Sequence, residues 1–499
     1  MRLVARRLVP LAVAVALAVA PAAAQRGAQR GAQRLTPLDV VIVGGRVIDP
    51  ETKFDAIRNV GVKGGKIVFV GTTTPAARDT VNAAGLVVSP GFIDLHAHGQ
   101  DDANYGFLAR DGVTTALELE LGTYPVAPWY AERAGKARIN YGTTVSHPGA
   151  RRAMLERDSS RAGTLVIYTD GPWARDTLTA SQFPALKERL TAGIRDGALG
   201  VGMGLAYTPG ASRAEGLSAF QVAAREKVPV YVHVRSGGPA DEDGPASVQE
   251  VLADAYSTGA SLHIVHITSV GTASTPVLLD MIEGARRAGH DVTTEAYPYT
   301  AGATSITAAI FDAGFQKRLG IDYKDLLMPA TGERLNAESF AKYRKSGGRV
   351  IIFSIPDSVP AQTYARPFVM VASDGSLSLS DGKLIGHPRS AGTHAKILAE
   401  FVRERHVLML SDAIARMTIM PAKRLEQADP RMKRKGRVQV GADADLTLFD
   451  PSTVKDKSTY ENGAIASEGI PFVLVNGIFV VRNGALVAHA TPGRAIRRQ

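Results

Sequence analysis

The sequence contains no cysteine, so any chemistry in this protein is carried by other residue types. That absence excludes disulfide bonds, thiolate metal sites and an N-terminal lipid-modified cysteine. Aromatic residues make up only 6% of the chain, and no basic stretch is interleaved with them as in nucleic-acid-binding segments. We therefore assign the net charge of +10 to a solvated surface and expect no nucleic-acid partner.

The N-terminus has the pattern of a secretory signal. A basic start that includes Arg6 and Arg7 precedes an apolar run and a small-residue exit, with cleavage expected after Ala24. We expect residues 1–24 to be this signal and 25–37, with the repeat "RGAQRGAQR", to be a flexible linker. The mature protein is then periplasmic or secreted, without stable membrane association. A twin-arginine signal stays open as an alternative.

Hydrophobic patterning divides the remaining chain into three parts. Short β-branched runs separated by turn residues fill 38–88 and 426–499, which predicts a small β-sandwich built from both termini. Between them, 89–425 alternates strand-length apolar runs with helix-like stretches. The expected strands are "VVSPGFIDLHAH", "VTTALELEL", "INYGTTVSH", "ALGVGMGLAY", "VPVYVHVR", "SLHIVHIT", "DVTTEAYPY" and "PFVMVASDG".

Eight such units favour an α/β fold of the (β/α)8 TIM-barrel type. An open doubly wound sheet is disfavoured because the first βα turn lacks a glycine-rich phosphate-binding sequence. An insertion at about 301–366 separates the last two strands, and we expect it over the barrel mouth.

Histidines and carboxylates gather where these strands end, at the face that holds the active site of such barrels. The residues at or near those ends are His96, His98, Glu118, Glu120, His147, His233, His263, His266 and Asp374. Neutral imidazole and carboxylate are the ligands that a borderline divalent ion such as zinc selects. The sequence therefore predicts a metal site at the barrel rim. No G-x-S-x-G sequence is present, and a metal mechanism needs no serine nucleophile.

Several motifs together resemble the amidohydrolase superfamily and, within it, the D-aminoacylase (N-acyl-D-amino-acid deacylase) branch. They are "PGFIDLHAH", "GALGVGMGLAYTPG", "VHVRSGG", "TEAYPYTAG", "VASDG" and "GHPRSAGT". The resemblance implies a metal-dependent hydrolase of C–N amide bonds with a (β/α)8 barrel. It also implies a small-molecule substrate, an acylated amino acid or a dipeptide-like amide.

By position, the resemblance implies that His96, His98 and Asp374 bind one metal ion and that His233 and His266 bind a second. One or two zinc ions are expected, with other divalent metals as alternatives. His263 lies three residues before His266. Residues an odd number apart on a regular strand point to opposite faces, so we do not predict His263 as a ligand.

The bridging ligand departs from the family pattern. D-aminoacylases have a cysteine near the position of Leu121, and other superfamily members use a carboxylated lysine on the fourth strand. This chain has neither, because "ALGVGMGLAY" contains no lysine. We predict that Glu120 bridges the metals, with Glu118 as second choice and otherwise a buried partner of one of the histidines.

The expected mechanism is attack by a metal-activated water, with Asp374 as general base that passes the proton to the leaving nitrogen. The family's substrate-binding lysine is replaced by Thr268. Substrate binding is therefore predicted for Arg235, Tyr297, Arg389 and His147.

Three alternatives remain at this point. A cyclic-amide hydrolase of the dihydroorotase or hydantoinase type, or an isoaspartyl-type dipeptidase, would share the same metal centre. A non-catalytic barrel scaffold is the more distant alternative, and the complete ligand set speaks against it.

Overall fold

The computed structural model describes residues 37–157, 170–238 and 243–499. The predicted signal at 1–24 and most of the linker lie outside these residues, so the signal and the extracytoplasmic location stay predictions. Within the described part, no helix combines the length and the apolar character needed to span a bilayer.

Eight parallel strands form the central sheet, which confirms the predicted fold class. Each of the eight quoted segments overlaps one of them. In hydrogen-bonded order they are β6 (Phe92–Asp94), β7 (Val113–Thr123), β8 (Asn140–Ser146), β9 (Val201–Gly204), β10 (Val230–His233), β11 (Leu262–Ile264), β12 (Val292–Ala296) and β17 (Val369–Val371). Almost every residue of these strands is buried, as expected for a parallel sheet covered by helices.

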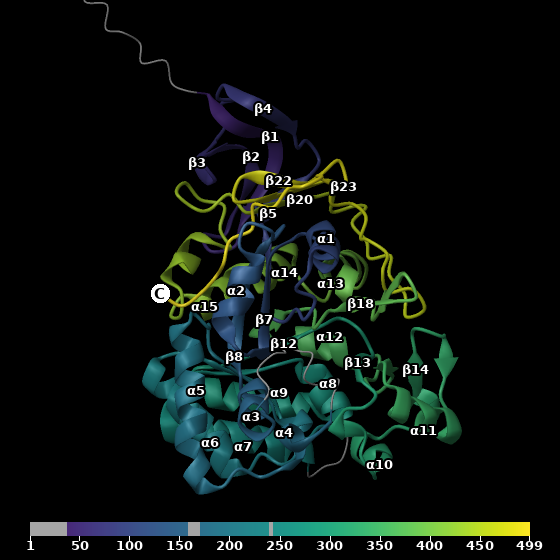
Figure 1. The fold of residues 1–499 in the computed structure, drawn as a ribbon. Helices are drawn as coiled ribbons and strands as arrows, with labels where there is room; N and C mark the ends of the chain where they lie inside the picture. Colours follow the sequence, from purple (N-terminus) through teal and green to yellow (C-terminus); the bar gives the residue numbers. More distant parts are fainter. Residues whose placement is uncertain (1–36, 158–169, 239–242) are drawn as a thin grey trace, which may run out of the picture. The chain divides into compact units, whose positions relative to one another are not determined.

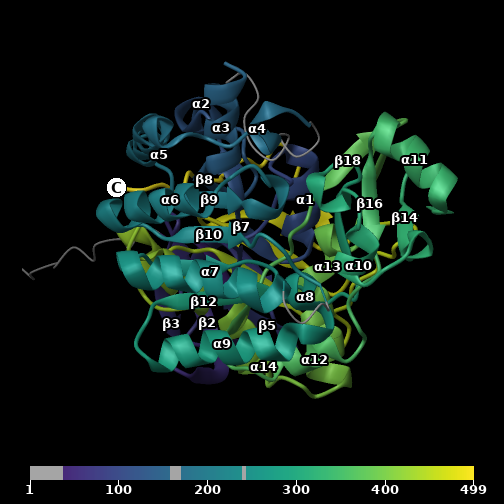
Figure 2. The same ribbon diagram turned by 90° about the horizontal axis from the view of Figure 1, so that it is seen from below.

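Helices line the outside of this sheet, and Figure 2 shows α5, α6, α7 and α9 running beside its strands. Their apolar faces pack on the strands in one large hydrophobic core. The helices are α1 (Asp102–Arg110), α2 (Val126–Arg133), α3 (His147–Leu155), α4 (Pro172–Arg175), α5 (Phe183–Arg195), α6 (Arg213–Glu226), α7 (Asp243–Thr258), α8 (Ile267–Gly271), α9 (Thr275–Arg287), α12 (Val359–Tyr364), α13 (Arg389–Lys396), α14 (Leu410–Met417) and α15 (Ile419–Leu425).

The first predicted strand is in fact two strands, which corrects the expectation of one continuous run. β5 (Val87–Pro90) pairs with strands of the terminal β domain, and only β6 belongs to the barrel. The chain changes sheets at Gly91, where a Cβ atom would lie 2.2 Å from the Thr114 side chain. His96 and His98 therefore follow a strand rather than end one.

The barrel closes at its carboxyl rim, where the segments after β6 and β17 meet. The Asp374 N–H donates to the His96 carbonyl at 2.7 Å, and the His98 N–H donates to the Gly375 carbonyl at 2.9 Å. Asp94 adds a side-chain link, since its Oδ1 accepts from the backbone N–H groups of both His96 and Ser373 at 3.0 Å. The closing bonds thus involve residues of the predicted metal site.

Strands from the two ends of the described chain form one nine-stranded sheet, and they lie side by side in Figure 1. Their buried aliphatic side chains form a second hydrophobic core. Besides β5, the strands are β1 (Leu38–Asp49), β2 (Phe54–Lys63), β3 (Lys66–Gly71), β4 (Ala77–Asn82), β20 (Leu446–Phe449), β21 (Phe472–Val475), β22 (Ile478–Arg482) and β23 (Ala485–Leu486).

Between β12 and β17 the chain forms a small antiparallel sheet with its own aromatic core. The strands of this sheet are β13 (Gly302–Ser305), β14 (Leu326–Met328), β15 (Glu333–Arg334) and β16 (Arg349–Ile352), and the same segment contains the helices α10 (Phe315–Leu319) and α11 (Ala337–Ser346). A hairpin of β18 (Leu377–Ser380) and β19 (Lys383–Gly386) follows β17.

A buried polar network joins the terminal sheet to the barrel. The Asp445 carboxylate accepts from the Asn140 side-chain amide at 3.0 Å, the Asn476 N–H at 2.6 Å and the Lys435 ammonium at 2.6 Å. Burial lowers the pKa of Lys435, but Asp445 and Asp443 outweigh it and raise the pKa above the usual value. The Lys435 ammonium is thus kept charged in the interior.

We expect Asp445→Ala to lower the free energy of unfolding by about 3 kcal/mol, because it removes the shorter of two carboxylate contacts of the buried Lys435 ammonium and the acceptor of the buried Asn476 N–H. Asp79→Ala is the control, since it removes a partly exposed ion pair with Arg482. It should cost less than about 1 kcal/mol. Urea unfolding followed by circular dichroism measures both, and equal losses would contradict the role of the network.

Candidate metal centre

The structure brings the six predicted ligand side chains together at the carboxyl rim of the barrel. They come from β7 and β10 and from the segments that directly follow β6, β11 and β17: His96, His98, Glu120, His233, His266 and Asp374. They form two donor groups, and the ligand atoms within each lie within 4.8 Å of one another.

The first donor group consists of His96, His98, Asp374 and Glu120. The two imidazole Nε2 atoms lie 3.1 Å apart. Asp374 Oδ1 lies 3.4 Å from the Nε2 of His96 and 3.2 Å from that of His98. Glu120 Oε2 lies 3.2 and 3.0 Å from the same two nitrogens. Four donor atoms thus converge on one point.

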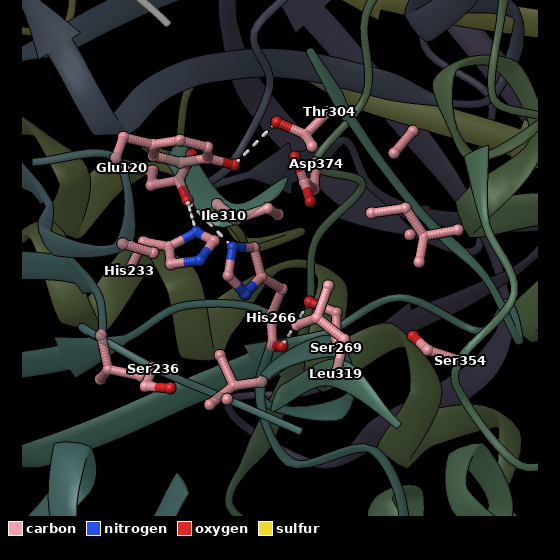
Figure 3. A pocket seen from close by; sticks show the side chains of 18 of the residues that line it. Glu120, His233, Ser236, His266, Ser269, Thr304, Ile310, Leu319, Ser354 and Asp374 are labelled. Atoms are coloured by element: carbon pink, nitrogen blue, oxygen red, sulfur yellow. Dashed lines mark hydrogen bonds and ion pairs between the residues drawn. The ribbon is translucent and has the colours of Figure 1, made fainter. Parts of the chain in front are cut away.

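The second donor group consists of His233, His266 and again Glu120. Glu120 Oε1 lies 2.7 Å from His233 Nδ1 and 2.9 Å from His266 Nε2. Figure 3 shows the Glu120 carboxylate beside both rings, with Asp374 nearby. Glu120 therefore offers one oxygen to each group, the arrangement that a bridging ligand requires.

Two further carboxylates orient the first pair of histidines. Glu295 Oε1 lies 2.8 Å from His96 Nδ1, and Glu118 Oε2 lies 2.8 Å from His98 Nδ1. A carboxylate accepts a hydrogen bond, so each Nδ1 carries a proton and each Nε2 points to the centre of the group, where it can bind a proton or a metal ion. Carboxylates commonly fix metal-binding histidines in this way. The donor set therefore fits a divalent metal ion.

Two of the ligand residues have left-handed backbones. His266 has φ 32° and ψ 55°, and Asp374 has φ 50°. Such conformations cost energy for residues other than glycine and concentrate at functional sites. The His266 N–H is held by Glu295 Oε1 at 2.7 Å, while that of Asp374 takes part in barrel closure. The fold thus fixes these two side chains at the rim.

A cavity of about 420 Å³ lies beside the two donor groups, and side chains of both groups line it. Tyr297 and Arg389, both predicted for substrate binding, line it. The Arg389 guanidinium contacts Asp374 Oδ2 at 2.9 Å and lies 4.6 Å from the centre of the Tyr297 ring. Figure 3 shows Ile310 and Leu319, from the antiparallel insertion, on the cavity wall. The insertion thus contributes to the pocket.

Two of the predicted substrate-binding residues are already paired elsewhere. Arg235 lines the cavity, but its guanidinium bonds Glu250 at 2.7 and 3.0 Å and the Ala211 carbonyl at 2.8 Å. His147 is absent from the described cavity lining, and its role in substrate binding stays a prediction. Its Nε2 contacts Glu215 at 2.8 Å in a buried cluster with Arg151, because His147 begins helix α3.

The sequence analysis left open the roles of His263 and Glu118, and it did not identify Glu295 or Tyr207. His263 contacts Thr293 at 2.8 Å and belongs to neither donor group, and Glu118 is the partner of His98. Glu295 was missed, although a glutamate within the apolar segment "VTTEAY" was an available signal. Tyr207, which packs against His233 with ring centroids 4.9 Å apart, was missed as well.

Comparison with known proteins agrees with this geometry. A family model described as "Amidohydrolase family" matches residues 79–481. The chain belongs to the amidohydrolase family. It is therefore a metal-dependent hydrolase of carbon–nitrogen bonds, which confirms the enzyme class expected from the sequence.

Similar proteins share most of their length with this amidohydrolase. The N-acyl-D-glutamate deacylase of Alcaligenes xylosoxydans xylosoxydans is 29% identical over 92% of this chain and 97% of the relative. The D-aminoacylase of the same organism is 28% identical over 93% and 98%. The structure of N-acyl-D-glutamate deacylase from Bordetella bronchiseptica, complexed with zinc and a phosphonate inhibitor, has a TM-score of 0.76 and 26% identity, and the match covers 93% of this chain and all of that one.

Charge in the amidohydrolase centre is balanced between carboxylates and imidazoles. Burial lowers the pKa of His96, but Asp374 and Glu120 outweigh it and raise the pKa to about 10. The pKa of His98 is also raised well above its usual value, despite burial, because of Glu118 and Asp374. Burial and the neighbouring His266 instead lower the pKa of His233. A metal ion would therefore compete with bound protons for the histidine nitrogens more strongly at the first donor group than at His233.

Metal affinity of the amidohydrolase should therefore rise with pH. A histidine with a raised pKa binds its proton throughout pH 6–8, so a metal that takes the Nε2 lone pair has to release it. Each proton released makes the apparent association constant grow about tenfold per pH unit. Calorimetric zinc titration in buffers of different ionisation enthalpy measures the proton count. Uptake without proton release, at equal affinity from pH 6 to 8, would contradict the charge balance described here.

Proposed function

We propose that this amidohydrolase removes the acyl group from N-acyl-D-amino acids with zinc as its metal. The proposal is supported by similarity to an N-acyl-D-glutamate deacylase and a D-aminoacylase over nearly the whole chain, and by a related structure that contains zinc. Its main structural support is a set of buried N–H and O–H groups, which are hydrogen-bond donors and lie beside the candidate metal ligands.

Three of these donors lack a partner in the described part of the chain. They are the Nε and Nη1 groups of Arg389 and the hydroxyl of Tyr297. Both residues line the cavity, and both are almost fully buried. A buried donor without a partner costs about 1–3 kcal/mol, so a ligand that supplies acceptors there is favoured. A carboxylate suits a guanidinium best because it accepts two hydrogen bonds at once. The α-carboxylate of an N-acyl amino acid meets this requirement.

The other wall of the cavity suits an uncharged group. Ile310, Leu319 and Val270 line it with aliphatic side chains. Pockets of a few hundred Å³ with apolar walls and a few directed polar groups are typical small-molecule sites. We assign the acyl chain or the amino-acid side chain to this apolar wall.

Catalysis needs a proton acceptor beside the scissile amide. The residues of the two donor groups would hold a divalent ion, which would supply the Lewis acidity needed to acidify water and polarise the amide carbonyl. Burial raises the pKa of Asp374, but Arg389 and His96 outweigh it and hold the pKa below the usual range. Asp374 therefore stays ionised at neutral pH. We assign to it the proton of the attacking water because its carboxylate lies among the donor groups, and it would deliver that proton to the leaving nitrogen.

The first test compares matched substrates. The zinc-loaded protein is expected to release free amino acid from N-acetyl-D-amino acids faster than from the L enantiomers, and a chelator should stop the release. Dipeptides and a hydantoin are assayed alongside. Cleavage of the ring amide or of dipeptides without cleavage of N-acetyl amino acids would overturn the substrate assignment while leaving the family membership intact.

A second test addresses the proton acceptor. Asp374→Asn should lower kcat at least about 100-fold at saturating zinc, because an amide cannot accept the proton of the water. Asp381→Asn, an exposed change in the turn between β18 and β19, is the control and should leave kcat unchanged. Steady-state kinetics together with zinc content by mass spectrometry separate loss of the base from loss of metal. A fully loaded Asp374→Asn protein with normal kcat would refute the role.

A further inference from the structure

Glu295 is a buried carboxylate that the proposed mechanism does not use. It lies on β12 and has no exposed surface. It belongs to neither donor group and does not line the main cavity. A carboxylate buried this completely costs several kcal/mol unless its partners compensate. Its partners should therefore reveal why the fold retains it.

Both polar contacts of Glu295 go to metal-binding candidates through the same oxygen. Oε1 accepts from His96 Nδ1 at 2.8 Å and from the His266 N–H at 2.7 Å. The other oxygen, Oε2, has no hydrogen-bond partner among the described residues. His96 belongs to the first donor group and His266 to the second. One oxygen atom thus holds one ligand residue of each group.

The two contacts act on their targets in different ways. At His96, the carboxylate keeps the proton on Nδ1, turns Nε2 toward the centre and makes the ring a stronger ligand. At His266, it binds the backbone N–H of a residue whose φ of 32° and ψ of 55° are left-handed. That bond offsets part of the conformational cost and fixes the backbone position from which the His266 side chain extends.

We propose that Glu295 is a positioning residue that couples the two metal positions. Removing its charge disturbs the tautomer at one position and the backbone support at the other, so binding weakens at both. This inference rests on the metal centre of the proposed function but not on its substrate.

Glu118 offers a matched comparison within the same site. It is also a buried glutamate on a barrel strand, and it contacts Nδ1 of His98 with oxygens at 2.8 and 3.0 Å. Its histidine contact reaches the first donor group. Glu295 adds to its histidine contact a hydrogen bond from the backbone N–H of His266, in the second group.

The experiment compares Glu295→Gln with Glu118→Gln in the full mature protein. Zinc affinities of both ions are measured by competition with a chromophoric chelator, and the unfolding temperature of the chelated protein reports on folding. Glu118→Gln should weaken one ion about 10–100-fold and leave the other within about threefold. Glu295→Gln should weaken both ions about 10–100-fold. The visible spectrum of the cobalt-loaded protein should change at both positions in Glu295→Gln only.

Several outcomes would overturn the coupling. They are unchanged affinities in Glu295→Gln, weakening of one ion alone, and a wild-type protein that binds a single ion. If Glu295→Gln does not fold, Glu295→Asp keeps the charge but shortens the reach and should weaken both ions by a smaller factor. A wild-type protein that binds two ions without cleaving N-acyl amino acids would refute the proposed substrate and leave the role of Glu295 testable.

Discussion

The metal centre depends on one shared carboxylate. Glu120 turns one oxygen to the histidine pair after β6 and the other to His233 and His266, and its side chain is 2% exposed. Burial raises the pKa of Glu120, but His96 and the hydrogen bonds of the other imidazoles outweigh it and hold the pKa well below the usual value. The carboxylate therefore stays ionised in the interior. A glutamate on the second strand thus occupies the position between the two donor groups in a chain without cysteine.

The backbone contacts that close the barrel also position the candidate metal ligands. The backbone bond from Asp374 to the His96 carbonyl closes the barrel at the rim and also brings two candidate ligands to one point. Asp94 accepts hydrogen bonds from the N–H of His96 and from that of Ser373, the residue before Asp374, and burial raises the pKa of its carboxyl. Misplacing a ligand here would open the last seam of the barrel. The geometry of the centre is therefore as rigid as the closure of the sheet.

Sequence reasoning predicted the strands and the residues of the two donor groups because both leave local signals. Buried parallel strands are continuous apolar runs, and the active-site residues of such barrels lie directly after these runs, at the rim. The features that the sequence did not predict depend on tertiary contacts. The run 87–98 gives no sign that it changes sheets at Gly91, and the local helix-start signal of Ser146 and Pro148 does not show that His147 pairs with Glu215. Glu295 was missed because its partners lie 199 and 29 residues away along the chain.

Arg389 connects substrate recognition with catalysis. One of its nitrogens bonds Asp374, while two other N–H groups in the same wall have no partner in the described chain. A substrate with a carboxylate satisfies these donors and brings its negative charge against the guanidinium. A neutral ring amide without a carboxylate would leave them buried and unpaired, which is how polar sites reject close analogues. The unpaired donors therefore favour acyclic N-acyl amino acids over neutral cyclic amides as substrates of this barrel.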